Sequence, residues 1–381
     1  MADAARQANL PSLGADTAAG SEAGLAAAGP GVARDGAGQD DPGAPGSEPP
    51  PPLRRRSLSH LAGRYWIVLV FIGLVVALSL MSSAFLTTRN IFNVLNQVAP
   101  TGIIACAAAL VIIAGGFDLS VGAIYSFAGV LAAIVSNATN NALIGSLAGV
   151  GGGLVLGLVN GLAVFFLGIN SFIATLATSL AFGGLTEVLT GGYLITVEAP
   201  GFNLLGNHRL WTVPLPVYVF AAVALITGLI LAKGTFGRHV YAAGGNQEAA
   251  RLSGVRIERV GVTTFAVSGL CAGLAGLIAT SRVNNGQAGS GSGIELTVIA
   301  AVVVGGISIS GGEGSIWRAV LGVLLIALLG NGFNILNVDP FYQSIAQGSI
   351  ILIAVAFDSR SGGLLRRYWQ RARRALARAR A

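Results

Sequence analysis

Residues 119–186 read LSVGAIYSFAGVLAAIVSNATNNALIGSLAGVGGGLVLGLVNGLAVFFLGINSFIATLATSLAFGGLT, a stretch without one charged side chain. A membrane-crossing helix needs about 20 apolar residues, so this stretch is long enough for three of them. Two polar breaks divide it, SNATNN at 136–141 and GINS at 168–171, and such clusters are typical of loops. The stretch therefore predicts three transmembrane helices joined by short loops.

Seven further uncharged windows flank this stretch, and each is long enough for one helix. Charged residues are strongly disfavoured in the hydrocarbon core, so they mark where membrane spans end. The windows lie between residues 64 and 89, 89 and 118, 209 and 233, 259 and 282, 295 and 313, 318 and 339, and 339 and 358. With 53% hydrophobic and 10% charged residues, the chain is not a soluble domain but an all-α membrane protein of about ten transmembrane helices.

The positions of Arg and Lys predict how these helices are oriented, because short loops that carry them stay in the cytoplasm. With ten crossings and a cytoplasmic N-terminus, the inner loops and adjoining ends hold 18 basic residues, whereas the outer loops hold three. We therefore expect both termini in the cytoplasm. The same bias explains the net positive charge, so we expect no nucleic-acid partner.

The two ends of the chain differ in composition from its middle. Residues 1–53 are acidic and rich in Ala, Gly and Pro, which predicts a disordered tail. We expect a transmembrane domain over 60–360 and a basic cytoplasmic tail over 361–381. A cleaved signal peptide over 54–85 is an alternative, but the apolar run lacks a small-residue cleavage motif, which favours a retained helix.

Cysteines, histidines and phosphate-binding motifs give no sign of catalysis. Cys106 and Cys271 lie singly in predicted helices, and the three histidines lack metal-ligand spacing. A P-loop needs a Lys directly after Gly, whereas the one Lys, Lys233, follows Ala232. We therefore expect no metal, no cofactor and no ATP hydrolysis by this chain.

The segment AGGFDLSVG at 114–122 places a carboxylate between two apolar windows. Asp118 could be the N-cap of the following helix, its side chain accepting bonds from the first free amides. Alternatively, Asp118 and Ser120 could line a polar cavity, because an ionisable residue at membrane depth is a functional candidate. Both interpretations stay open on the sequence.

The loop 233–259 is the longest predicted on the cytoplasmic side. Gly244-Gly245-Asn246 indicates a turn, with Asn246 as the cap of a short helix over 247–253 that ends at Gly254. Glu248 near its start and Arg251 near its end suit the helix dipole. This helix is either an amphipathic surface turn or a docking surface for a partner.

Four blocks in this order resemble the ribose-type monosaccharide permeases of ABC importers. They are GGFDLSVG at 115–122, Asn160-Gly161 with NSFIATL at 170–176, residues 238–254, and Glu295-Leu296 through GGISISGG at 305–312. The resemblance covers about residues 60–360. The family often has an Asp two residues after the Glu that Glu295 matches, whereas this chain has Thr297.

The resemblance implies a permease subunit in a bacterial inner membrane that works by alternating access. Its partners would be separate ABC ATPase subunits, a periplasmic or lipid-anchored sugar-binding protein, a second permease copy or paralogue, and membrane lipid. It implies a gating or docking role for Glu295 at the external mouth. The ATPase-coupling loop would contain Arg238, Gly244, Gly245, Asn246, Glu248, Ala249, Ala250, Arg251 and Gly254.

A sugar is neutral, so its path needs hydroxyl and amide groups that bind weakly enough to allow transit. The candidates for the substrate path are Asp118, Ser120, Asn160, Asn170, Ser171 and Thr175. Each of the last four could equally form a hydrogen bond between helices.

Other classes of function stay in view. A permease for branched-chain amino acids or autoinducer-2 would share the architecture, although a zwitterion would favour charged partners that are scarce here. A secondary transporter would need an ion or proton relay, for which Asp118 alone is thin support. An intramembrane enzyme is the least favoured, because the chain has no His-Glu-x-x-His and no paired intramembrane aspartates.

Overall fold

The computed structural model describes residues 58–339, 341–343, 345–346, 348–349 and 352. The predicted tails over 1–53 and 361–381 and most of the last predicted window, 339–358, lie outside these residues. The domain boundaries therefore stay predictions.

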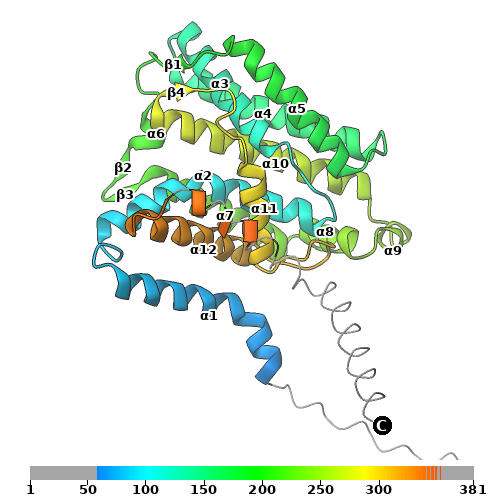
Figure 1. Cartoon of the computed structure of the whole chain (residues 1–381). Coiled ribbons are helices and arrows are strands. Elements are labelled where there is room, and N and C mark those ends of the chain that lie inside the picture. The colour runs from blue at the N-terminus through cyan, green and yellow to red at the C-terminus, as the bar shows by residue number, and fades with distance from the viewer. Residues whose placement is uncertain (1–57, 340, 344, 347, 350–351, 353–381) are drawn as a thin grey trace, which may run out of the picture. The chain divides into compact units, whose positions relative to one another are not determined.

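Helices make up most of the described chain (Figure 1). They are α1 (Leu58–Met81), α2 (Thr88–Ile113), α3 (Val121–Thr139), α4 (Ala142–Phe165), α5 (Ser171–Thr190), α6 (Leu204–Asn207), α7 (Leu215–Lys233), α8 (Thr235–Gly245), α9 (Gln247–Leu252), α10 (Ile257–Val283), α11 (Ile294–Val304) and α12 (Ile316–Ile335). The strands β1 (Ile195–Thr196), β2 (Arg209–Leu210), β3 (Val213–Pro214) and β4 (Asn285–Gly286) are short.

Seven of the described helices are long and apolar enough to cross a membrane: α2, α3, α4, α5, α7, α10 and α12. The three predicted within 119–186 are all present as α3, α4 and α5. Helices α1 and α11 occupy two other predicted windows, but α11 has only 11 residues because it ends before the pair Gly305-Gly306. The helical membrane architecture is confirmed, while the total of ten crossings stays a prediction.

Helices α2 and α10 lie at the centre of the bundle (Figure 1). The apolar windows of α2 and α10 are 83% and 67% buried, compared with 22% for those of α4, α5 and α7. Both cysteines are buried in these two central helices, as expected for small packing residues.

Glycines bring α4 and α10 into backbone contact. Gly153 and Gly157 of α4 face Gly269 of α10, and a methyl group on Gly153 would lie 2.6 Å from the Gly269 carbonyl oxygen. Small residues four apart allow this close approach between membrane helices. Gly153 and Gly157 therefore serve helix packing, whereas Gly151 beside them has open space.

The two ends of the bundle carry different structures (Figure 1). At one end lie two antiparallel strand pairs, β1 with β4 (Ile195 opposite Gly286) and β2 with β3 (Arg209 opposite Pro214), together with α6. At the other end lie α8 and α9. The sequence predicted loops, and not strands, at the first end, because two-residue strands leave no periodic pattern.

Candidate functional site

A buried polar network surrounds Asp118 in the loop between α2 and α3. Its Oδ1 accepts hydrogen bonds from the Ser120 backbone N–H (3.0 Å) and hydroxyl (2.6 Å), and its Oδ2 accepts one from the Ser268 hydroxyl (2.7 Å). The Asn160 amide donates to the Ser120 hydroxyl at 2.6 Å. The network therefore ties the loop to α4 and α10.

The N-cap interpretation of Asp118 is wrong. Ser120 occupies the N-cap position of α3, and its side chain makes no capping bond. The Asp118 carboxylate instead turns into the bundle, where it accepts bonds from the hydroxyl groups of Ser120 and Ser268. Only neutral groups of the described residues donate to it.

Asn160 retains one unused acceptor. Its side chain is fully buried, and its Oδ1 has no hydrogen-bond donor among the described residues, although its Nδ2 donates to Ser120. A buried acceptor without a donor is uncommon and costs free energy of desolvation. This oxygen could therefore accept a bond from a hydroxyl or a water.

Two further predicted residues hold the same loop from the other side. The Ser171 hydroxyl accepts a bond from the Phe117 N–H at 3.1 Å, and the Thr175 hydroxyl accepts one from the Leu119 N–H at 3.0 Å. The extended stretch 117–119 therefore lies against the first two turns of α5.

Asn170 is the N-cap of α5, where its Oδ1 accepts bonds from the amides of Phe172 and Ile173. Of the six predicted path residues, the other five contact one another or the loop 115–120. A path-lining role for any of them stays a prediction, because each has an interhelical or capping bond.

The predicted helix of the long loop is confirmed as α9. Asn246 caps it by accepting a bond from the Ala249 N–H, Glu248 and Arg251 occupy its first and last turns, and Gly254 follows with φ +83°. Ala250 is buried, whereas Glu248, Ala249 and Arg251 are exposed. Arg251 also forms an ion pair of 2.8 Å with Glu258 that the sequence did not predict.

The predicted turn at Gly244-Gly245-Asn246 is wrong in part. Gly244 and Gly245 are the last residues of α8, a helix that contains exposed Arg238 and that the sequence did not predict. Two adjacent glycines have a low helix propensity. Tertiary packing overrides this propensity, because Val240 and Ala243 are buried against the bundle.

Four glycines form a backbone contact that we call the glycine junction: Gly115, Gly244, Gly311 and Gly312. A methyl group on Gly244 would overlap the Ile113 carbonyl and lie 2.6 Å from the Gly312 nitrogen. A methyl group on Gly311 would lie 3.0 Å from both the Gly115 Cα and the Gly244 carbonyl oxygen. The junction therefore joins α8 to the end of α2 and to the loop between α11 and α12.

The Tyr241 hydroxyl strengthens this attachment by donating a 2.8 Å bond to the Gly314 carbonyl. Burial raises the pKa of Tyr241 above its ordinary value, so the hydroxyl keeps the proton that it donates. The sequence has Gly-Gly pairs directly after two apolar helices, at 115–116 and 305–306, and the first of these pairs supplies Gly115 to the junction. In each pair one glycine has positive φ, Gly115 at +90° and Gly306 at +85°, which ends the helix.

Glu295 lies in the first turn of α11, with its Oε1 accepting a 3.2 Å bond from the Gly293 N–H. A methyl group on Gly122, in the first turn of α3, would overlap Glu295 Oε2. Glu295 is therefore near the start of α3 and near the Asp118 loop, far from the other end of α3 at Thr139. Its predicted gating role is not tested by this geometry.

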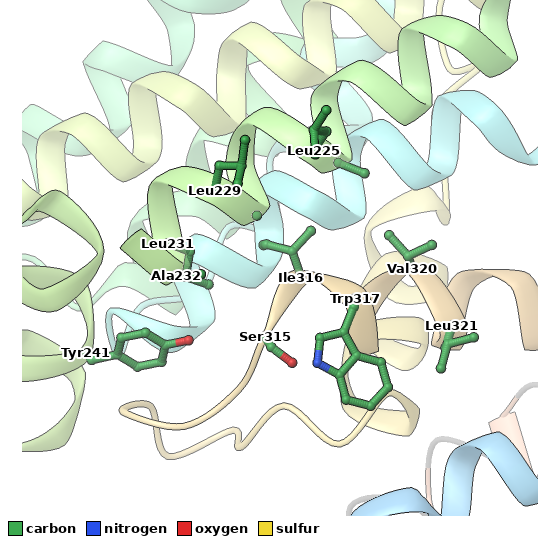
Figure 2. A pocket seen from close by; sticks show the side chains of 12 residues that line it. Leu225, Leu229, Leu231, Ala232, Tyr241, Ser315, Ile316, Trp317, Val320 and Leu321 are labelled. Carbon is green, nitrogen blue, oxygen red and sulfur yellow. The ribbon is translucent and has the colours of Figure 1, made fainter. Parts of the chain in front are cut away.

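An apolar groove of about 550 Å³ lies between α7 and α12. Figure 2 shows Leu225 and Leu229 on one side and Trp317, Val320 and Leu321 on the other, with Tyr241 at one end. A concave pocket is the usual first candidate for a ligand site. These walls offer a sugar very few hydrogen bonds, so the groove does not suit a polar solute.

Metal chemistry has no ligand set in the described part of the chain. No group of three or more His, Cys, Asp or Glu side chains lies close enough together there to hold an ion.

The family described as branched-chain amino acid transport system / permease component matches residues 90–355. The L-arabinose transport system permease protein AraH of Escherichia coli is 39% identical over 318 residues, covering 84% of this chain and 94% of that protein. The ribose import permease protein RbsC of Bacillus subtilis is 43% identical over 293 residues, covering 76% and 91%. No solved structure matches the chain. With seven long apolar helices among its described residues, the chain is a multi-pass membrane protein, and it belongs to the family of transport permease components that includes the ribose and L-arabinose permeases.

Proposed function

We propose that this chain is the permease subunit of an ABC importer that carries a monosaccharide across a bacterial inner membrane. The observation that carries the proposal is the similarity to two permeases named for L-arabinose and ribose. The alignments span 94% and 91% of the length of these two relatives. Both sugars are pentoses, so a pentose is the first substrate to test. The polar side chains buried around Asp118 offer hydroxyl and amide groups that suit neutral solutes.

The energy for transport comes from separate ATPase subunits that dock on α9. The exposed residues Glu248 and Arg251 supply a charged surface on this helix, and Leu252 is an 82% exposed apolar side chain beside them. An apolar anchor within a polar rim is a common form of protein interface. Docking there requires α8 and α9 on the cytoplasmic side, in agreement with the excess of basic residues in the loop 233–259.

Movement of the ATPases reaches the membrane helices through the glycine junction. Helix α8 follows α7 and precedes α9, and Gly244 contacts both the end of α2 and the loop before α12. Backbone contacts without intervening side chains leave little room for slippage between these segments. Alternating access then follows from a shift of α2 and α12 relative to α10.

The remaining components are a sugar-binding protein outside the membrane and a second permease, either another copy or a paralogue. The chain itself needs no cofactor, because ATP is bound by the partner ATPase. The assembly is tested by reconstituting the purified chain in proteoliposomes with and without its ATPase and binding protein. Labelled ribose, arabinose, xylose, galactose and glucose are followed into the vesicles.

Uptake that requires ATP and every component supports the proposal and identifies the sugar. Uptake by the chain alone under an imposed ion gradient contradicts it and indicates a secondary transporter. The description of the matched family makes branched-chain amino acids a second candidate. Labelled leucine in the same assay separates the two substrate classes.

A further inference from the structure

Residues 284–293 connect α10 to α11 by a non-helical route. After β4, the glycine-rich sequence QAGSGSG at 287–293 forms successive turns before α11 begins. At the start of this route, Gly286 packs against Val130 and Ala133 of α3. At its end, Gly291 packs against Gly122, and the Gly291 N–H donates a 2.8 Å hydrogen bond to the Ser126 hydroxyl.

These contacts show that the segment runs along a membrane-spanning helix. The two contact points lie about seven residues apart on α3, which corresponds to roughly 10 Å along the helix axis. Because α3 is long and apolar enough to span the membrane, the segment runs within the thickness of the bilayer. It reaches the level of Ser120, which belongs to the Asp118 network.

The outer side of the segment is polar and exposed. Gln287, Ser290 and Ser292 are exposed, as are Gly289 and Gly293 between them. Within the described part of the chain, the backbone N–H groups of Ala288 and Gly289 have no hydrogen-bond acceptor. This surface therefore needs water or another polar partner.

Such a surface cannot face lipid. Unpaired backbone groups in hydrocarbon cost several kcal/mol each, and irregular backbone occurs at membrane depth only where it is buried in protein or lines a water-filled cavity. We propose that residues 287–297 form one wall of a water-filled path that binds the hydroxyl groups of a polyhydroxylated solute. That solute is a sugar if the function proposed above is correct.

The chemistry of the wall suits such a ligand. Gln287 and Ser292 supply neutral donors and acceptors, and half-buried Glu295 supplies acceptor oxygens next to them. The Ser290 hydroxyl donates to the Ser126 hydroxyl at 3.4 Å, so its oxygen is left as an acceptor. These groups lie on turns along one side of the path and do not enclose the solute, which suits the weak binding that transit requires. Discontinuous helices beside a solute path are common in transporters.

The test measures whether water reaches this wall. Ser290→Cys and Ser292→Cys are compared with Val155→Cys, whose side chain is 56% exposed on the apolar surface of α4. The native Cys106 and Cys271 are buried, so the unsubstituted chain measures the background reaction. A charged, membrane-impermeant methanethiosulfonate is applied to both sides of proteoliposomes that contain the chain with its ATPase and binding protein.

Only the thiolate reacts, and hydrocarbon strongly disfavours it, so S290C and S292C should react at least about a hundredfold faster than V155C. An excess of transported sugar should slow the reaction of S290C and S292C and leave the reaction rate of the unsubstituted chain unchanged. Rates as slow as that of V155C would show a dry protein or lipid contact and overturn the inference.

The same vesicles separate this inference from the proposed function. If the vesicles take up sugar at the normal rate but labelling is slow, the proposal that residues 287–297 line the path is overturned and the proposed function stands. Fast labelling without uptake of any tested sugar supports the water-filled path and contradicts the sugar permease.

Discussion

The backbone N–H of Gly312 donates a 2.8 Å hydrogen bond to the carbonyl oxygen of Ile113, across almost 200 positions of sequence. This bond joins the end of α2 to the loop before α12. Gly244 of α8 packs against both of its ends. The region proposed to couple ATPases to the membrane domain thus touches the end of one membrane helix and the loop that leads into another.

The first prediction concerns Gly244. Gly244→Ala places a methyl group against the Ile113 carbonyl and the Gly312 nitrogen, so the junction must open. We expect a loss of about 1–3 kcal/mol of unfolding free energy and a clear fall in ATP-driven uptake. Gly245→Ala is the matched control, because its added methyl group meets nothing within 4 Å. Equal uptake by the two variants would contradict the coupling route.

The second prediction concerns the buried carboxylate. Asp118→Ala leaves the hydroxyls of Ser120 and Ser268 without their acceptor and should lower unfolding stability by about 2 kcal/mol, measured by thermal unfolding in detergent. Asp118→Asn should be nearly neutral, because its oxygen can accept from Ser120 and its amide can donate to the Ser268 oxygen.

Uptake by the Asn variant tests a second point. If Asp118 acts only by hydrogen bonding, Asp118→Asn keeps ATP-driven uptake. A folded Asp118→Asn protein without uptake would indicate that the charge takes part in transport, as in a proton relay.

The third prediction concerns the packing of α4 on α10. Gly157→Ala forces a methyl group to within 2.8 Å of the Gly269 Cα, and overpacking of this kind costs about 1–3 kcal/mol. Gly151→Ala on the same helix has open space and replaces a poor helix former, so it should stabilise by up to about 1 kcal/mol. Thermal unfolding of the two variants should therefore move in opposite directions.

The fourth prediction concerns the surface of α9. Combining Glu248→Arg with Arg251→Glu reverses the charges offered to an ATPase and should abolish uptake while membrane insertion stays normal. The ion pair between Arg251 and Glu258 is exposed, so its loss costs at most about 1 kcal/mol. Glu258→Gln removes the same pair without changing α9 and should keep uptake. Loss of uptake in this control would assign the effect to the ion pair instead.

The membrane helices could be predicted from the sequence because the hydrocarbon core excludes charge. The uncharged stretch 119–186 with its two polar breaks predicted α3, α4 and α5, and Asn246 with Gly254 predicted the bounds of α9. These features depend on residues near one another in the chain. The transport family could likewise be recognised from four local blocks of sequence.

What only the tertiary structure decided is which distant residues meet. The Asp118 network includes side chains from α4 and α10, and the capping role that the local pattern allowed for Asp118 was wrong. The pair Gly244-Gly245 resembles a turn until the end of α2 and the loop 305–315 are packed against it. A bilayer forces each span to be apolar, which makes spans visible in sequence. The bilayer does not determine which polar groups and glycines of different spans meet, because three-dimensional packing decides that. The Asp118 network and the glycine junction are both formed by such contacts between distant residues.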